Sequence, residues 1–557
     1  MESSAQSSLP FRLDGEIAII TGGATGLGFG MARCFVASGA KVVLVGRREE
    51  ELKNAVAALG SAATHVAHDV TNFDRAGELV EAATLAAGAS PGVGSELQLS
   101  PMKRPRKYAT FLSSTMKNQS PFITLLWFLA AFSPLRAGNP NILLIVADDM
   151  GYADAGFNGG TEIKTPKLDE LARGGANLKS FYVQPVCSPT RSTLMTGRYP
   201  SNTGVYSVVR PHALWGLKLE EQTMAQMLGS AGYETSICGK WHLGEFEPAY
   251  RPTKRGFEHQ YGLWFGAIDY FTHQRDGVLD WHRNDEPCDD KGYATHLLAK
   301  EACRRIQEKD PAKPLFLYLP FNAVHGPLQV PESYTVPYAG LKGQRRIYAG
   351  MLAAMDEAIG QVIAALDEKK IRDNTLIIFT GDNGGPSPGK VTSNGPLRAG
   401  KGTIYEGGVR VCAFANWPGR IPAGQTINEP LHGVDWYPTL AKLTSSPLQQ
   451  KLPLDGRDIL PVLTESAKSP HEAIILCGTQ RGQAAIRKGD WKLVVHSGKG
   501  KNKGQSGMEL YNLSDDLGES RNRAQEEPEK LKELRSIYDK MMSSAVPAGG
   551  GEGVSEE

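Results

Sequence analysis

Hydrophobic residues in the central part of the chain gather in short continuous runs, each followed by polar residues. The runs at 142–146 and 376–380 are almost wholly apolar, which is typical of strands buried on both faces of a parallel sheet. Runs at 233–238 and 315–319 have a similar form. An amphipathic stretch at 348–366 predicts a long helix that covers such a sheet. The pattern therefore predicts an α/β domain, with a large mixed, mostly parallel sheet sandwiched by helices.

After this domain the pattern changes to short strands followed by one amphipathic helix. The strands are expected at residues 472–476, 484–487, 491–495 and 509–513, and the helix at 528–542. This order predicts a small C-terminal antiparallel sheet with a packed helix. The last residues, 546–557, are rich in glycine and acidic side chains and are expected to be disordered.

The first 88 residues have a separate pattern of strand, glycine-rich turn, helix and strand. An apolar run at 16–20 leads into the glycines of residues 21–28, and a second run at 41–45 ends before Arg47. In such a βαβ unit the glycines allow close approach of a pyrophosphate, and an arginine can meet a 2′-phosphate. The segment resembles the N-terminal part of short-chain dehydrogenases/reductases but ends without their Tyr-x-x-x-Lys motif. We interpret it as a truncated Rossmann fragment; NADP-dependent oxidoreductase activity is an alternative that the missing motif disfavours.

The segment that follows this fragment has the composition of a linker and then of a secretory signal. Residues 89–107 are rich in Gly, Ser, Pro and basic side chains. Met116, the apolar run 121–132 and the small residues after it match a secretory signal, and the run is too short for stable membrane insertion. We therefore expect export (periplasmic, extracellular or lysosomal) if translation starts near Met116, with the chain joining two reading units.

These patterns divide the chain into five expected segments. They are a truncated Rossmann-like fragment at 1–88, a linker with a signal-like segment at 89–138, a catalytic domain at 139–445, a C-terminal subdomain at 446–545 and a disordered tail at 546–557.

Composition and charge exclude several classes of protein. The formal net charge of +1 over 557 residues gives no indication of a nucleic-acid partner. The seven cysteines are scattered, without a Cys-x-x-Cys pair or a zinc-site spacing, so they do not indicate a disulfide framework. Cys288 and Cys303 are close enough in sequence to pair, and the odd number leaves at least one thiol over.

Two predicted strands of the large sheet end in oxygen-bearing side chains. The first strand precedes Asp148 and Asp149, and the last precedes Asp382 and Asn383. Ligand sites of open α/β sheets lie beyond the carboxyl ends of the strands, so these four side chains are expected to meet. Three carboxylates close together repel one another, and a hard divalent cation offsets that repulsion. The sequence therefore predicts a metal site here.

The other two strands precede basic residues. Lys240 and His242 follow one of them, and His325 follows the other. A further lysine, Lys401, lies in the glycine-rich stretch 395–403, which does not meet the phosphate-loop pattern Gly-x-x-x-x-Gly-Lys-[Ser/Thr]. We therefore expect an anion-binding lysine there and no nucleotide site.

The stretch Cys187-Ser188-Pro189-Thr190-Arg191 begins a predicted short helix and continues to Thr196-Gly197-Arg198. It resembles the pattern of the type I sulfatases of the alkaline phosphatase superfamily, Cys-x-Pro-x-Arg followed by Thr-Gly-Arg. The resemblance spans about residues 140–525 and, at 314–331, is closest to the arylsulfatase B (N-acetylgalactosamine-4-sulfatase) branch. It implies an alkaline phosphatase-like fold and hydrolysis of sulfate esters, with a sulfated small molecule or polysaccharide as substrate.

The resemblance also implies the parts of an active site. A formylglycine-generating enzyme is expected to oxidise Cys187 to formylglycine, whose aldehyde hydrate is the nucleophile. The implied ligands of one calcium ion are Asp148, Asp149, Asp382, Asn383 and the oxidised Cys187. Arg191 is implied to steady the formylglycine, and the implied sulfate-pocket residues are Lys240, His242, His325 and Lys401.

Two other functions remain open for this domain. A phosphodiesterase or phosphonate hydrolase can be built on the same scaffold, and a protein whose Cys187 is never oxidised would be an inert binding protein. Trp264 and residues 266–273 are expected to line the sugar side of the site, which indicates a carbohydrate sulfate without identifying it.

Overall fold

The computed structural model describes residues 13–14, 17–68, 139–496 and 507–549. The chain forms two compact units, residues 1–136 and 137–557. The predicted linker and signal-like segment at 89–138 lies outside the described residues, as does the end of the predicted tail after residue 549.

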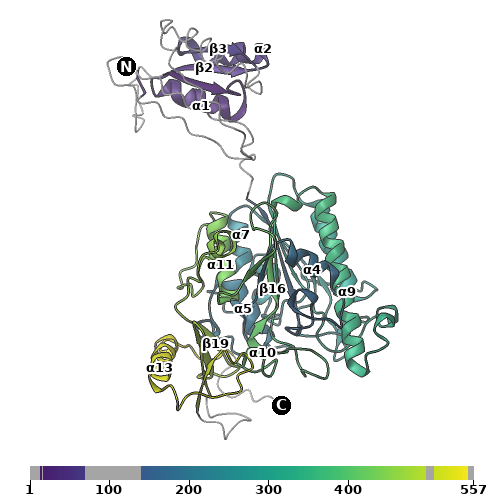
Figure 1. The fold of residues 1–557 in the computed structure, drawn as a ribbon. Helices are drawn as coiled ribbons and strands as arrows, with labels where there is room; N and C mark the ends of the chain where they lie inside the picture. Colours follow the sequence, from purple (N-terminus) through teal and green to yellow (C-terminus); the bar gives the residue numbers. More distant parts are fainter. Residues whose placement is uncertain (1–12, 15–16, 69–138, 497–506, 550–557) are drawn as a thin grey trace. The chain divides into compact units, whose positions relative to one another are not determined.

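The described part of the first unit is a βαβαβ fragment (Figure 1, purple). Its elements are β1 (Ile17–Thr21), α1 (Gly26–Ala37), β2 (Lys41–Gly46), α2 (Glu49–Leu59) and β3 (Ala63–Ala67). The strands pair in parallel in the order β1-β2-β3. A β-carbon at Gly28 would lie 2.3 Å from the carbonyl oxygen of Gly22, so glycine is needed where α1 approaches the turn. The predicted partial Rossmann unit is confirmed.

The second unit is built on a ten-stranded sheet in the order β12-β11-β8-β7-β13-β4-β14-β16-β5-β17. The bounds are β4 (Asn141–Ala147), β5 (Ala176–Leu178), β7 (Glu234–Cys238), β8 (His259–Gly262), β11 (His282–Arg283), β12 (Glu286–Pro287), β13 (Leu315–Pro320), β14 (Thr375–Gly381), β16 (Ala413–Asn416) and β17 (Gln425–Ile427). Strands β8, β7, β13, β4 and β14 form a parallel centre, whereas β11 and β16 pair antiparallel to it. The mixed, mostly parallel sheet predicted from the sequence is confirmed.

Both faces of this sheet are covered, which explains why its central strands are continuously apolar. Leu143 and Ile145 of β4 belong to one buried cluster, and Leu144 and Val146 belong to the cluster on the opposite face. Figure 1 shows the helices in two layers on either side of the sheet. One layer contains α4 (Pro166–Arg173), α8 (Ala294–Glu308) and α9 (Gly343–Glu368), and the other contains α5 (Cys187–Thr196), α7 (Met224–Ser230) and α11 (Trp436–Leu443).

The predicted long amphipathic helix is α9, which is 26 residues long. Among the described residues it is the one helix long and apolar enough to cross a membrane by length and composition. Its apolar side chains, including Met351, Leu352 and Met355, are buried in the cluster against the sheet. Within this unit α9 is therefore a core helix.

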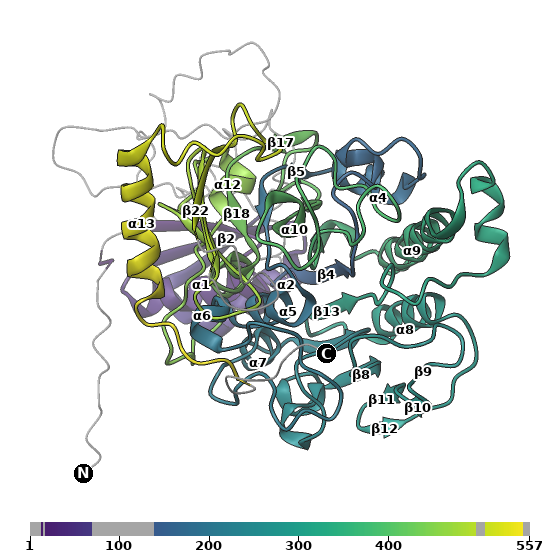
Figure 2. The same cartoon turned by 90° about the horizontal axis from the view of Figure 1, so that it is seen from below.

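A four-stranded antiparallel sheet follows, with the order β19-β20-β21-β22 and one packed helix. Its elements are β19 (Ile474–Cys477), β20 (Ala484–Lys488), β21 (Trp491–Val495), β22 (Met508–Asn512) and α13 (Pro528–Met542). Figure 2 shows α13 alongside this sheet, and Leu534 and Tyr538 join the same buried cluster as Ile475 and Ile486. The predicted small antiparallel sheet with a helix is confirmed.

The small sheet and the large sheet belong to the same compact unit. The buried Lys492 of β21 pairs with Glu406 at 2.9 Å and with Glu519 at 2.8 Å. Val546 and Gly549, at the start of the predicted tail, donate backbone hydrogen bonds to Ser201 and Gly204. The first residues of that tail are thus bound to the rest of the unit.

The remaining elements are short. They are α6 (Pro200–Thr203), α10 (Glu406–Val409), α12 (Leu460–Glu465), β6 (Phe181–Tyr182), β9 (Gln274–Arg275), β10 (Val278–Leu279), β15 (Arg410–Val411) and β18 (Leu431–His432). Residues 406–409 form the single turn α10. Cys288 and Cys303, which the sequence left open as a pair, are both free thiols.

Candidate functional site

Four neighbouring strands end at the candidate site. In the order β7-β13-β4-β14 they are direct neighbours in the sheet, although their sequence order is different. The last residue of β14, Gly381, pairs with the last residue of β4, Ala147, so Asp148 and Asp382 emerge side by side. The backbone N–H of Asp149 donates to Asp382 Oδ1 at 3.2 Å. The parallel sheet thus brings together two pairs of oxygen-bearing side chains, Asp148–Asp149 and Asp382–Asn383, that are more than 230 residues apart in the chain.

Helix α5 begins at Cys187 and is buried along its whole length. The Cys187 Sγ atom lies 3.5 Å from Asp148 Oδ1, at the N-terminal end of the helix. One turn later, Arg191 donates to Asp148 Oδ2 at 3.3 Å and to Asp382 Oδ2 at 3.0 Å. Arg191 also donates to the carbonyl oxygen of Lys240 at 2.7 Å, which ties α5 to the end of β7. The spacing of four residues therefore places Cys187 and Arg191 on the same carboxylate, that of Asp148.

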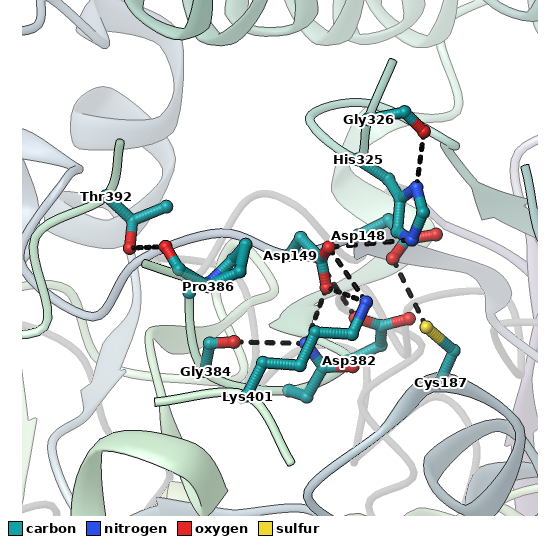
Figure 3. A network of polar contacts seen from close by, with 12 residues as sticks. Asp148, Asp149, Cys187, His325, Gly326, Asp382, Gly384, Pro386, Thr392 and Lys401 are labelled. Carbon is teal, nitrogen blue, oxygen red and sulfur yellow. Dashed lines mark hydrogen bonds and ion pairs between the residues drawn. The ribbon is translucent and has the colours of Figure 1, made fainter. Parts of the chain in front are cut away.

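Basic side chains surround the acidic pair Asp148 and Asp149 (Figure 3). Lys240 forms an ion pair with Asp148, and Lys401 Nζ lies 2.7 Å from Asp149 Oδ1. His325 Nε2 lies 3.6 Å from Asp149 Oδ2. Lys240 is fully buried, whereas the side chains of Lys401 and His325 retain about a fifth of their exposure, so these two face the opening of the site.

The pKa values at the site reflect burial and these charges. Burial alone would raise the pKa of Asp148, but Lys240, His325, Arg191 and Lys401 outweigh it and hold the pKa well below its usual range. Burial, together with the charges of Asp148 and Asp382, raises the pKa of the Cys187 thiol to about 12, although Lys240 and Lys401 lower it. The thiol is therefore protonated at neutral pH and is a weak nucleophile in this form.

His242 lies beside this network with a fully buried ring. Burial lowers its pKa well below the usual value, and Lys240 and Arg191 lower it further, so the imidazole is neutral. Its Nδ1 atom has no hydrogen-bond partner among the described residues. The neighbouring Gly266 leaves room for the ring, because a β-carbon there would lie 2.6 Å from Cε1 and Nε2 of His242.

The donor atoms suit a hard metal ion. Ligand atoms of Asp148, Asp149, Cys187 and His325 lie within 4.8 Å of one another. This group differs from the implied calcium ligands, because it includes His325 and does not include Asp382. The amide of Asn383 donates to Asp149 Oδ1 at 2.7 Å, and its buried Oδ1 has no partner among the described residues. Carboxylate and amide oxygens are ligands that calcium prefers, whereas the Cys187 sulfur is not. The site fits such an ion better once Cys187 bears oxygen.

The structure brings the sequence-predicted site residues into one region. Direct contacts join the three carboxylates to Cys187, Arg191, Lys240, His325 and Lys401. Asn383 contacts Asp149, and His242 borders this group. Two contacts to His242 were not predicted. Ser188 Oγ donates to the carbonyl oxygen of His242 at 2.8 Å, and Gly266 packs on its ring. Ser188 lies in the predicted motif and Gly266 in the stretch expected to line the sugar side, but the local pattern indicated neither contact with His242.

Comparison with protein families gives two matches. The family described as sulfatase matches residues 140–446. The family described as short chain dehydrogenase matches residues 16–89. The first match contains every candidate site residue described above.

Curated relatives match the same part of the chain. Arylsulfatase J of Mus musculus is 39% identical over 374 residues, which cover 64% of this chain and 62% of that protein. Arylsulfatase A of Homo sapiens is 35% identical over 391 residues, covering 63% and 74%. N-acetylgalactosamine-6-sulfatase of Canis lupus familiaris is 35% identical over 350 residues, covering 58% and 66%. The chain thus spans about two thirds of the length of these relatives.

Solved structures have the same fold as the second unit. The crystal structure of Ps i-CgsB in complex with k-i-k-neocarrahexaose superposes with a TM-score of 0.70 at 32% identity, covering 75% of this chain and 95% of that one. The PsFucS1 sulfatase from Pseudoalteromonas sp. has a TM-score of 0.63 at 26% identity, covering 73% and 90%. The phosphonate monoester hydrolase of Agrobacterium radiobacter, at 21% identity and a TM-score of 0.53, shares the fold.

Proposed function

The chain belongs to the sulfatase family, and we propose that it hydrolyses sulfate esters at the centre formed by Cys187 and the neighbouring carboxylates. The observation that carries this proposal is the position of Cys187, buried at the start of α5 with its Sγ atom 3.5 Å from Asp148 Oδ1. A protonated thiol is poorly suited to attack an ester, whereas the same side chain converted to an oxygen-bearing group suits both attack and metal binding.

Two groups complete the proposed site. Oxidation of Cys187 to formylglycine, by a formylglycine-generating enzyme, supplies an aldehyde whose hydrate is an oxygen nucleophile. A calcium ion held by Asp148, Asp149, Asp382, Asn383 and the oxidised Cys187 supplies Lewis-acid polarisation of the sulfate group.

The fixed charges of the site favour an anionic substrate. Three carboxylates (Asp148, Asp149 and Asp382) face three permanent cations (Arg191, Lys240 and Lys401). A bound divalent cation therefore leaves the centre with an excess of positive charge, which stabilises a sulfate group and the charge that develops on its oxygens during hydrolysis. Arg191, fixed by two carboxylates and a carbonyl oxygen, is proposed to steady the modified side chain.

Proton transfer is assigned to the residues at the opening and to His242. Burial lowers the pKa of Lys401, but Cys187, Asp149 and Asp148 outweigh it and raise that pKa, so its ammonium group stays charged beside the substrate. His325 Nδ1 lies 2.6 Å from the carbonyl oxygen of Gly326 and therefore carries the proton of the neutral ring. The other ring nitrogen, Nε2, faces Asp149 in the site. We propose that Lys401, or His325 in its imidazolium form with a proton on Nε2, protonates the departing alcohol. The neutral His242 takes up a proton in the step that releases sulfate.

The proposed substrate is a sulfated carbohydrate. Support comes from relatives named for N-acetylgalactosamine sulfate and from the related Ps i-CgsB, whose crystal contains a neocarrahexaose. Within this class, the sequence at 314–331 favours N-acetylgalactosamine-4-sulfatase-like specificity. Export of the chain, inferred from the signal-like segment, would give it access to such extracellular or lysosomal material.

The test combines chemistry at Cys187 with substrate choice. Mass spectrometry of the peptide that contains Cys187 is expected to detect loss of sulfur and gain of an aldehyde when a formylglycine-generating enzyme is co-expressed. The same preparation is expected to hydrolyse p-nitrophenyl sulfate faster than the corresponding phosphate mono- and diesters, and Cys187→Ala is expected to be inactive. Cys412→Ala, another buried thiol, is the matched control. Activity of an unmodified thiol form equal to that of the modified form would overturn the proposal, and faster phosphodiester cleavage would favour the related hydrolases.

A further inference from the structure

A row of ring side chains runs from Phe265, the residue before Gly266, to the solvent. The His242 ring packs on Gly266, and Phe265 is the residue before it. The Phe265 ring lies 5.5 Å from the His212 ring in an edge-to-face arrangement, and the His212 ring lies 6.3 Å from the Phe246 ring. Residues from three loops of the second unit thus form one continuous surface, which we name the aromatic wall: His212, Phe246 and Phe265.

The outer part of the aromatic wall is open to water. Phe265 is 7% exposed, whereas Phe246 is 48% exposed and His212 is also exposed. The neighbouring Leu214 is 71% exposed. A large apolar ring held in water beside a reactive centre is typical of a ligand-binding surface, because folding alone would favour its burial.

Hydrogen bonds hold the aromatic wall in place. The backbone N–H of His212 donates to Glu245 Oε1 at 2.6 Å, and Arg251 Nε donates to the Glu245 carbonyl oxygen at 3.0 Å. On the other side, the backbone N–H of Phe265 donates to the buried Asp280 at 2.7 Å. The rings are therefore presented on fixed backbone segments. This reduces the conformational entropy that the protein loses when a ligand binds.

Basic side chains lie beside the aromatic wall. The Arg251 guanidinium lies 4.6 Å from the centre of the Trp264 ring, and Arg210 is exposed two residues before His212. This combination of flat apolar rings and cations is complementary to a polymer whose sugar rings have apolar faces and whose sulfate groups are anionic.

We propose that the aromatic wall is a binding subsite for a second sugar ring of a sulfated polysaccharide, adjacent to the sugar from which His242 and its neighbours remove sulfate. The ring of Phe246 stacks on that sugar, and His212 and Arg210 face its anionic groups. This inference rests on the proposed sulfatase function and extends it, since a subsite for a second ring makes the substrate an oligomer or polymer and not a monosaccharide sulfate.

The experiment compares a small substrate with long ones. Variants Phe246→Ala and His212→Ala are assayed on p-nitrophenyl sulfate and on hexasaccharides of chondroitin 4-sulfate and of iota-carrageenan. We expect KM for the hexasaccharide that is cleaved to rise by about tenfold, with kcat/KM for p-nitrophenyl sulfate within about twofold of wild type. Phe246→Trp is expected to retain the hexasaccharide KM because it keeps a ring. Leu219→Ala is the matched control, because Leu219 is 56% exposed on the loop that carries His212.

A binding measurement separates this inference from the catalytic one. In the Cys187→Ala background, isothermal titration with the same hexasaccharide is expected to detect binding that Phe246→Ala weakens by a similar factor. If wild type cleaves p-nitrophenyl sulfate but the two variants leave hexasaccharide KM and binding unchanged, the subsite is wrong and the sulfatase function stands. An equal loss of kcat/KM on p-nitrophenyl sulfate and on the hexasaccharide would also overturn the proposed subsite. Absence of any sulfatase activity in modified wild type would overturn both.

Discussion

The ring of His242 lies against Gly266 so closely that a β-carbon on the glycine would be 2.6 Å from two ring atoms. His242 itself has a positive φ of 58°, and its backbone N–H donates to the carbonyl oxygen of Trp264 at 3.0 Å. The position of the imidazole is therefore set by the segment that contains Gly266, which follows β8, whereas His242 follows β7.

Replacement of Gly266 by alanine is expected to lower kcat on p-nitrophenyl sulfate by roughly 10–100-fold, because the methyl group displaces the ring that accepts a proton. Steady-state kinetics and a thermal unfolding curve measure the two effects separately. The control is Gly340→Ala, since nothing lies within 4 Å of a β-carbon there. In a His242→Ala background the same substitution is expected to cause no further loss; an additional loss there would mean that Gly266 acts through the fold instead.

Calcium is expected to stabilise the protein through the carboxylate centre. At a calcium concentration of about 100 times the Kd, the gain in the free energy of unfolding is about 2.7 kcal/mol. Urea unfolding with EDTA and with added calcium measures this increment. In Asn383→Ala the increment is expected to shrink, because the unpartnered Oδ1 is lost, whereas Asp289→Asn, an exposed carboxylate, keeps it. An equal increment in wild type and Asn383→Ala would contradict the assigned ligand.

Removal of the buried Lys492 is expected to destabilise the second unit. In Lys492→Met, Glu406 and Glu519 remain buried without their shared cation, which costs about 3–5 kcal/mol in the free energy of unfolding. Lys488→Met on the neighbouring strand, with partly exposed partners, is expected to cost less than about 1 kcal/mol. Adding Glu519→Gln to Lys492→Met is expected to recover part of the loss. Similar costs for the two single variants would show that the buried cation is not essential.

The stability of the second unit is expected to fall as the pH rises through the range set by Asp280. Burial raises the pKa of Asp280 to about 7, against the lowering effect of the Trp264 and Phe265 N–H groups. Between about pH 4 and 7 the folded protein therefore holds a proton that the unfolded chain releases, so this group lowers the free energy of unfolding by up to about 1.4 kcal/mol per pH unit.

Urea unfolding at several pH values measures that slope. Asp280→Asn is expected to show a flatter dependence than wild type between pH 4.5 and 7, because its amide does not titrate. Asp276→Asn, whose side chain is 89% exposed, is expected to keep the wild-type slope. Parallel curves for Asp280→Asn and wild type would exclude Asp280 as the source of the effect.

Much of the fold followed from local patterns. The runs at 142–146 and 376–380 are strands β4 and β14 within one or two residues, because a strand covered on both faces needs apolar residues at every position. Helix α13 has the predicted bounds, 528–542. Ligand sites of parallel sheets lie beyond the carboxyl ends of the strands, and from this rule we predicted that Asp148 and Asp382 would meet.

Pairing between distant segments could not be read from these patterns. The sequence alone selected the candidate site residues: Cys187, the strand-end residues Asp148, Asp149, Asp382 and Asn383, and the basic residues after the strands. Only the tertiary structure decided that His325 lies among the potential metal ligands, that Lys492 joins Glu406 and Glu519, and that Gly266 bounds the ring of His242. The physical reason is that a local pattern encodes how much of a side chain is buried, whereas its partners depend on which strands become neighbours in space.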